Sequence, residues 1–237
     1  MGRKKRFSAR WRIMAAVLLA ALVGGAYAWW QFIHWTPPRA AWPMQGIIIG
    51  ARDLPDSGPG VNFVAFKAVG ADFAYLEASR GATARDPTFA RNITAVRAAG
   101  LPAGAVHHYD PCIRADLQAA NFVTVVPRDD ALLPPAIELD ETADGCQEPV
   151  SDAAVESELM TFINQVEGHS GKPALLKISR RFEERYHLAN AIDRNLWLSR
   201  DRFQPDYAGR PWALWTANSA LRSEASDVPV RWVAVQP

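Results

Sequence analysis

An uncharged apolar stretch near the amino terminus constrains this chain more than any other feature. Residues 13–30 (IMAAVLLAALVGGAYAWW) carry no charged side chain, and the run ends in Trp29 and Trp30. Such a stretch is typical of a membrane-spanning helix, and tryptophan is favoured at the lipid interface. We therefore predict a transmembrane segment at 13–30, with the chain that follows it outside the cytoplasm.

Basic residues cluster before that stretch. Six of the 26 lysines and arginines lie within the first twelve residues, at positions 3–6, 10 and 12, whereas the first acidic residue is Asp53. Their removal leaves 20 basic against 25 acidic residues. Positive charge beside an apolar segment favours the cytoplasmic side, and an acidic remainder argues against nucleic acid as a partner. We predict a basic cytoplasmic tail at 1–12 on a single-pass inner-membrane protein, with its domain facing the periplasm or cell exterior.

A cleavable signal peptide is the alternative interpretation of the same segment. Ala26-Tyr27-Ala28 fits the small-x-small cleavage pattern, and the apolar run is short for a full membrane span. Both interpretations place residue 46 and everything after it outside the cytoplasm.

The chain has two cysteines, Cys112 and Cys146. An even number in an exported domain suggests a disulfide, with two separate buried thiols as the alternative. Two cysteines offer too few ligands for a zinc site. His107 and His108 are adjacent on a predicted strand, so they point to opposite faces and cannot chelate one metal ion. The sequence therefore predicts no metal and no cofactor.

The apolar segment is followed by a tether and then by one domain. Residues 31–44 contain Pro37, Pro38 and Pro43 and read as an extended tether. The domain, 45–237, contains eight predicted strands, at 46–49, 72–77, 103–109, 136–140, 174–178, 196–199, 212–216 and 230–235. Helical periodicity fills the gaps at 62–69, 87–99, 114–126 and 153–167, the last with Ser151 as N-cap.

Strand and helix alternate through the first two thirds of the domain. This α/β pattern favours a parallel sheet, because crossover helices need parallel neighbouring strands. We predict an irregular TIM-like β/α barrel that is β-rich in its last third. An open doubly wound sheet is the alternative, but no G-x-G-x-x-G follows the first strand.

Short motifs along 46–235 follow one order. They read GIIIG from Gly46, DFAYLEASRG, DPTFARN, GLPAGAVHHY, LPPAIELD, GKPALLKIS, NLWLS, RPWALW and DVPVRWVAV. In order and spacing the chain resembles the glycoside hydrolase family 25 lysozymes, whose motifs run GIDVSxxQG, FAYIKATEG, DPxFxxN, GLPxGAYHF, PPVLDLE, GKxPIIYT, LWIA, WxxWQY and VDLN. The resemblance implies an N-acetylmuramidase that cleaves the β-1,4 bond between N-acetylmuramic acid and N-acetylglucosamine in peptidoglycan.

The chain departs from this pattern in the predicted cleft. Ile48 and Arg231 stand where the family has aspartates, and Glu138-Leu139-Asp140 replaces D-x-E. Other cleft positions also differ: Glu77 replaces Lys, Arg80 replaces Glu, Val106 and Lys177 replace Tyr, and Thr216 replaces Gln.

Glu138 and Asp140 are the predicted catalytic residues. Side chains two apart on a strand point to the same side, roughly 6.6 Å apart along the chain. Two close carboxylates repel, so one of them should keep its proton and act as the general acid. By position Asp140 inherits the acid of the family. The alternative is that the pair is a solvated or ion-paired strand end.

Aromatic and polar residues near the strand ends are candidates for sugar contacts. The predicted substrate-binding residues are Tyr75, Glu77, His107, Tyr109, Trp197 and Trp215, with core packing as the alternative for each aromatic ring. We predict a membrane-anchored, lysozyme-like hydrolase of peptidoglycan with impaired catalysis. The competing hypothesis is a pseudoenzyme that binds glycan or a protein partner without cutting.

Overall fold

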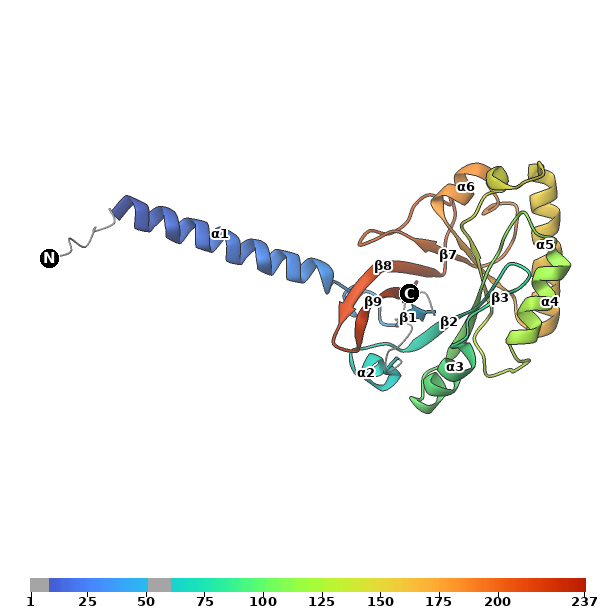
Figure 1. The fold of residues 1–237 in the computed structure, drawn as a ribbon, viewed down its shortest axis with the longest axis horizontal. Helices are drawn as coiled ribbons and strands as arrows, with labels where there is room; N and C mark the ends of the chain where they lie inside the picture. Colours follow the sequence, from blue (N-terminus) through green and yellow to red (C-terminus); the bar gives the residue numbers. More distant parts are fainter. Residues whose placement is uncertain (1–8, 51–60) are drawn as a thin grey trace. The chain divides into compact units, whose positions relative to one another are not determined.

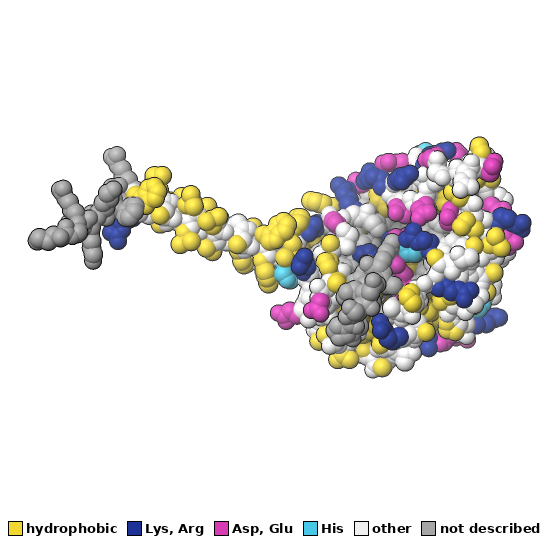
Figure 2. Space-filling view, viewed as in Figure 1, with side chains coloured by type: hydrophobic (Ala, Val, Ile, Leu, Met, Phe, Trp, Pro, Cys, Tyr) yellow, Lys and Arg dark blue, Asp and Glu magenta, His cyan; other side chains and the backbone are white. Residues whose placement is uncertain are grey.

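The computed structural model describes residues 9–50 and 61–237; the basic residues at 3–6 and Asp53 lie outside this part of the chain. Two compact units meet between Trp35 and Thr36. The first contains helix α1 (Ala9–Ile33), whose surface is largely hydrophobic in Figure 2. Its Trp11–Ile33 stretch, with a mean hydropathy of 1.8, is long and apolar enough to cross a membrane, properties that a signal sequence shares.

Eight strands of the second unit close into a barrel (Figure 1). They are β1 (Gln45–Ile49), β2 (Phe73–Arg80), β4 (Ala103–His108), β5 (Ala136–Leu139), β6 (Leu175–Ile178), β7 (Leu196–Ser199), β8 (Leu214–Ser223) and β9 (Ser226–Val235). All neighbours pair in parallel except β9, which is antiparallel to both β8 and β1. The two-residue β3 (Ala84–Arg85) pairs with the end of β2 outside the closed ring.

Five helices of the second unit complete the described part of the domain. They are α2 (Phe63–Ala68), α3 (Phe89–Ala98), α4 (Ala115–Val125), α5 (Asp152–Ser170) and α6 (Arg180–Tyr186), with a short 3-10 turn η2 (Ala143–Gly145) before α5. Ser151 caps α5 by accepting a hydrogen bond from the Ala154 amide, as predicted, and Ser179 caps α6 in the same way. The left-handed Gly171 ends α5, a conformation that glycine adopts without strain.

The predicted closed barrel with a β-rich last third is confirmed, but the barrel is not a regular (β/α)₈ barrel. The antiparallel β9 breaks the all-parallel pattern of that fold. The long β8–β9 hairpin, the short β3 and the helix α6 were not predicted. The remaining strands and helices lie close to their predicted ranges.

Alternate side chains separate two apolar layers. One layer fills the barrel interior with a residue from every strand: Ile48, Phe73, Tyr75, Val106, Ala136, Leu175, Trp197, Leu214 and Val233. The larger layer lies between the barrel and its helices. Inside the barrel, the Tyr75 ring lies so close to Gly104 that a Cβ there would come within 2.3 Å of it, so this position requires glycine.

The predicted disulfide is confirmed: Cys112 and Cys146 are bonded, with their Cα atoms 5.3 Å apart. It joins the loop after β4 to the loop after β5. In the chain-entropy model, cross-linking residues 34 positions apart stabilises the fold by about 3–4 kcal/mol. The disulfide therefore restrains the segment that follows the carboxyl end of β5.

Candidate active site

Five ionisable side chains lie at the carboxyl end of the barrel interior. They occupy the next alternate position beyond the apolar interior residues of their strands, and we call them the charged layer: Glu77 from β2, His108 from β4, Glu138 from β5, Lys177 from β6 and Arg231 from β9. Their side chains are only 9–12% exposed. Charges this far from water require close partners of opposite sign.

The members of the charged layer contact one another in a chain. Arg231 Nη2 donates to Glu77 Oε1 at 2.6 Å, and Lys177 Nζ donates to Glu138 Oε1 at 2.6 Å. His108 lies between the two carboxylates, with Nε2 3.2 Å from Glu77 Oε1 and Nδ1 3.4 Å from Glu138 Oε2. Two acids are thus matched by two bases, with an imidazole joining the two pairs.

The position of Glu77 depends on a glycine. A Cβ at Gly50 would lie 2.3 Å from Glu77 Oε2, so a larger residue would collide with the carboxylate. Gly50 immediately follows β1, next to β2 in the barrel. The local sequence at the end of β1 therefore leaves the space that the Glu77 side chain fills.

The charged layer holds Glu138 in its ionised form. Burial opposes ionisation, but Lys177, His108 and Arg231 outweigh it and lower the pKa of the Glu138 carboxyl to about 2. The sequence predicts that one carboxylate of the pair holds its proton. Glu138 is not that residue, because two permanent cations lie within 4.0 Å of it.

Asp140 has a different environment from Glu138. It is exposed and directly follows β5, one alternate position beyond the charged layer. The Leu139 carbonyl before it accepts a hydrogen bond from the Ser179 amide at 2.9 Å, which fixes the backbone there to the end of β6. Of the two predicted catalytic residues, Asp140 is the one that solvent and ligands can reach.

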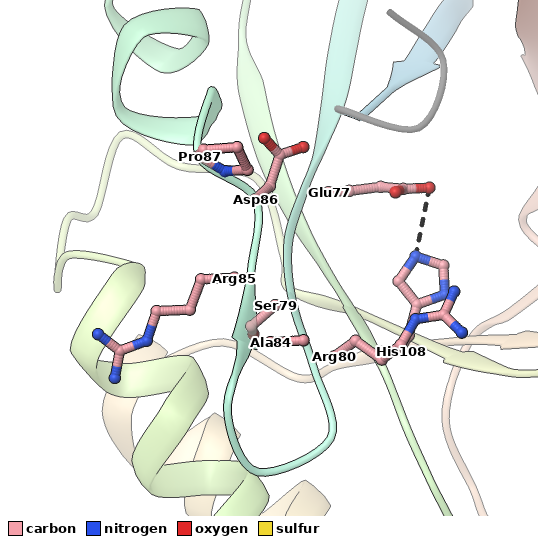
Figure 3. A pocket seen from close by; sticks show the side chains of 8 residues that line it. All are labelled: Glu77, Ser79, Arg80, Ala84, Arg85, Asp86, Pro87 and His108. Atoms are coloured by element: carbon pink, nitrogen blue, oxygen red, sulfur yellow. Dashed lines mark ion pairs between the residues drawn. The ribbon is translucent and has the colours of Figure 1, made fainter. Parts of the chain in front are cut away.

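A pocket of about 200 Å³ opens beside the charged layer. Figure 3 shows Glu77 and His108 on one side of it and Asp86 and Pro87, which precede α3, near its other end. The Arg85 side chain points away from the pocket, where its Nε donates to Asn121 Oδ1. The pocket thus presents both acidic and basic groups beside the layer.

Three of the predicted substrate-binding aromatic residues, Tyr75, Tyr109 and Trp197, are buried in the core. Tyr75 and Trp197 pack edge to face inside the barrel, 2% and 0% exposed. Tyr109 packs on Phe162 of α5 and is 2% exposed. A sugar has no access to these rings in this structure. For Tyr75 and Trp197, alternation along the strand was compatible with either role, and depth within the barrel decides between them. Tyr109 lies in the layer between the barrel and its helices.

His107 also lies away from the cleft. Its side chain points out of the barrel, bonds to Ser79 Oγ at 2.8 Å and packs on Phe162. Burial lowers its pKa to about 3, so the imidazole is neutral. His108, on the opposite face of the same strand, is the histidine that reaches the charged layer.

Trp215 packs on the outside of the barrel against Trp42 and donates its indole N–H to the Arg200 carbonyl at 2.7 Å. Among the predicted substrate-binding residues, Glu77 alone lies in the charged layer. His108, Lys177 and Arg231 were not predicted as site residues. Each of them lies two positions along its strand from an apolar residue of the barrel interior. This spacing could have identified them from the sequence.

Glu77, His108 and Glu138 offer ligand atoms that lie within 4.8 Å of one another, a spacing that could hold a metal ion. Both carboxylates are already paired with Arg231 and Lys177. A metal ion at this place would lie next to the positive charges of Arg231 and Lys177, which would repel it. The arrangement balances its own charge without an ion.

Comparison with known proteins identifies relatives for most of the domain. Residues 56–222 match the sequence profile of glycosyl hydrolases family 25. An uncharacterized Escherichia coli K12 protein, YegX, is 26% identical over 162 residues, which cover 67% of this chain and 57% of that protein. The matched stretch is thus little more than half the length of that relative.

Solved structures share the fold. A family 25 glycosyl hydrolase from Bacillus anthracis superposes with a TM-score of 0.74 at 20% identity, over 86% of this chain and 93% of that one. A bacterial lysozyme from Streptomyces coelicolor gives a TM-score of 0.71 at 19% identity, over 82% and 92% of the two chains. At these identities the likeness establishes the fold.

The charged layer gives a prediction for acid stability. Because the pKa of Glu138 is lowered from its ordinary 4.5 to about 2, its ion pairs stabilise the fold above pH 4.5, and that stability is lost as the pH falls toward 2. Glu138→Gln should therefore lower the free energy of unfolding at pH 6. The difference in unfolding free energy between the variant and the unchanged protein should be about 2–3 kcal/mol smaller at pH 2 than at pH 6. Urea unfolding followed by tryptophan fluorescence measures both values. Glu141→Gln, at an exposed carboxylate, is the control, and a gap that is constant with pH would contradict the assignment.

The Glu77–Arg231 pair gives a second prediction. Arg231→Asp alone places a carboxylate beside Glu77 and Glu138 and should cost about 3–5 kcal/mol of unfolding free energy. Adding Glu77→Lys restores opposite charges and should recover most of the loss. Arg97→Asp, in the exposed pair with Asp129, should cost under about 1 kcal/mol. Chemical denaturation of the four proteins measures the effect, and equal losses in the single and double variants would refute the pairing.

Proposed function

The chain belongs to glycosyl hydrolase family 25, and on that premise we propose that its barrel domain is a lysozyme-type glycoside hydrolase acting on peptidoglycan. The proposed bond is the β-1,4 linkage between N-acetylmuramic acid and N-acetylglucosamine. Support comes from the family match and from the lysozyme fold of its structural neighbours.

The observation that carries this proposal is the pair of carboxylates at the carboxyl end of β5, of which Glu138 is ionised and Asp140 is exposed. Glycoside hydrolysis needs a group that protonates the leaving oxygen and a group that stabilises positive charge on the sugar. Asp140, exposed at the strand end, is the proposed acid. Glu138, kept ionised by the charged layer, is the proposed stabilising group.

We propose that this chemistry is slow. Lys177 and Arg231 neutralise much of the Glu138 charge, which leaves less of it to stabilise an oxocarbenium ion. Asp140 is one methylene shorter than the glutamate of the family motif. A displacement near 1 Å can cost about a hundredfold in rate.

Binding of peptidoglycan without hydrolysis is the second candidate. The specific observation in its favour is the balanced charge of the layer, in which both carboxylates are bonded to cations. A site of this kind can hold a glycan strand while lacking a carboxylate free to assist bond cleavage.

Substitution of Asp140 separates the two candidates. If Asp140 is the acid, Asp140→Asn should reduce hydrolysis by about 100-fold or more, because the amide cannot donate the proton. Digestion of purified peptidoglycan, followed by mass analysis of the products, measures the rate. Asp130→Asn makes the same charge change at an exposed residue before β5, at the opposite end of the barrel, and should leave the rate unchanged. Digestion that persists in Asp140→Asn would show that another residue is the acid, and a native protein that releases no product would support the binding candidate.

We further propose that α1 anchors the protein in the inner membrane with the domain in the periplasm or outside the cell. The length and apolar composition of Trp11–Ile33 support this proposal. Trp29 and Trp30, near its carboxyl end, suit the lipid interface. Enzymes that act on the cell wall also need access to that side of the membrane.

Membrane fractionation tests the anchor. The protein should remain in the membrane fraction after alkaline extraction, and its intact mass should include residues 1–30. Ala28→Leu, which removes the small residue required before a signal cleavage site, should leave mass and location unchanged. A soluble product that begins at Trp29, and that disappears in Ala28→Leu, would instead identify a signal peptide.

A further inference from the structure

The loop between β7 and β8 carries an aromatic ring that the fold leaves in solvent. Phe203 is 66% exposed. Among the described residues of the second unit, 36–50 and 61–237, every other aromatic side chain is buried or half-buried. Burial of a phenyl ring is favourable, and this ring stays in solvent at the carboxyl end of the barrel, the end that also carries Asp140.

Frayed backbone does not explain the exposure, because the loop is firmly bonded. The Trp215 indole N–H donates to the Arg200 carbonyl at 2.7 Å, and the Trp212 indole N–H donates to the Pro205 carbonyl at 3.1 Å. Arg202, directly before Phe203, has a φ of 64°, and its amide donates to the Ala217 carbonyl at 2.7 Å. A residue other than glycine keeps this left-handed conformation only where its surroundings hold it. The loop backbone on both sides of Phe203 is therefore held in place.

A network of polar groups suited to sugar hydroxyls begins beside the ring. The Arg200 guanidinium lies 5.6 Å from the Phe203 ring centre, and the Arg180 guanidinium lies 5.0 Å from that of Tyr207. Both arginines bond to Asp206 Oδ1, at 3.1 and 3.3 Å. We call these residues the Phe203 patch: Arg180, Arg200, Phe203, Asp206 and Tyr207. They alternate aromatic faces with groups that donate or accept hydrogen bonds.

The Phe203 patch lies on the same end of the barrel as Asp140. The Tyr207 hydroxyl donates to the Ile178 carbonyl at 2.7 Å and accepts from the Ser199 amide at 3.0 Å, at the ends of β6 and β7. Asp140 follows β5, whose Leu139 pairs with Ile178. From β5 to β7 is two strand spacings, about 10 Å. An oligosaccharide can span that distance.

From these observations we infer that the Phe203 patch is a distal sugar subsite for the glycan strand, an inference that rests on the proposed function. A pyranose ring stacks its apolar face on Phe203, and Arg200 and Asp206 bond to its hydroxyl and acetamide groups. The subsite holds the strand so that another sugar lies over Asp140. Glycans long enough to reach both places bind more tightly than a disaccharide.

The test is calorimetric titration of the full-length protein in detergent, with all variants made in an Asp140→Asn background so that no ligand is consumed. The probes are a peptidoglycan tetrasaccharide of alternating N-acetylglucosamine and N-acetylmuramic acid, and the corresponding disaccharide. Phe203→Ala should weaken tetrasaccharide binding about threefold to tenfold, the range expected for one aromatic contact. Phe203→Trp should retain the affinity. Leu117→Ala, at an exposed apolar residue of α4, should have no effect.

The outcomes separate this inference from the proposed hydrolysis. Tetrasaccharide affinity that is equal in Phe203→Ala and in its parent overturns the subsite, even where the native protein digests peptidoglycan. If tetrasaccharide affinity depends on Phe203 but the native protein releases no product, the subsite is supported and the proposed hydrolysis is refuted. The absence of tetrasaccharide binding in the parent overturns the subsite directly.

Discussion

The carboxyl end of this barrel is held together by ion pairs between side chains that have almost no contact with water. Below the charged layer lies an interior of aliphatic and aromatic residues, so Glu77 and Glu138 border an apolar interior. Each carboxylate therefore depends on the cation beside it, Arg231 or Lys177. Removal of one partner would leave a buried charge uncompensated, a change that costs several kcal/mol. The members of this layer can change only in combination.

This dependence alters how the departures from the family motifs are understood. Taken from the sequence alone, Arg231 in place of an aspartate indicates a lost acid. In the structure Arg231 bonds to Glu77, which stands where the motif has a lysine. The two substitutions together reverse the polarity of one pair and keep the layer balanced. Ile48, the register partner of Arg231 on β1, fills the apolar interior with no exposed surface. The charged layer therefore differs from the family motif in which residues carry each charge, but its opposite charges remain paired.

The sequence predicted the strands, four helices and the disulfide because these depend on local periodicity and on a single pair of cysteines. It missed α6 and β3, which are too short to show a period, and the β8–β9 hairpin, whose outer half carries polar residues. The Glu77–Arg231 contact joins positions 154 residues apart and depends on strand register, which no local pattern records. For Tyr75 and Trp197, alternation gave the correct face of the strand. It could not give the depth along the barrel, and depth is what buries them.

Depth along β5 also determines what each carboxylate can do. Ala136, Glu138 and Asp140 point to the same side at successive alternate positions. Ala136 lies in the apolar interior, Glu138 in the charged layer and Asp140 in solvent. Ionisation of Glu138 is therefore set by the protein, while Asp140 is left for the ligand to surround. On the proposed function, Asp140 touches the sugar and exchanges the proton, and Glu138 acts through its charge from the layer beneath. Exchange of the two residue types between these depths would put the longer side chain nearer the sugar, but it would also shorten the carboxylate side chain that is bonded to Lys177.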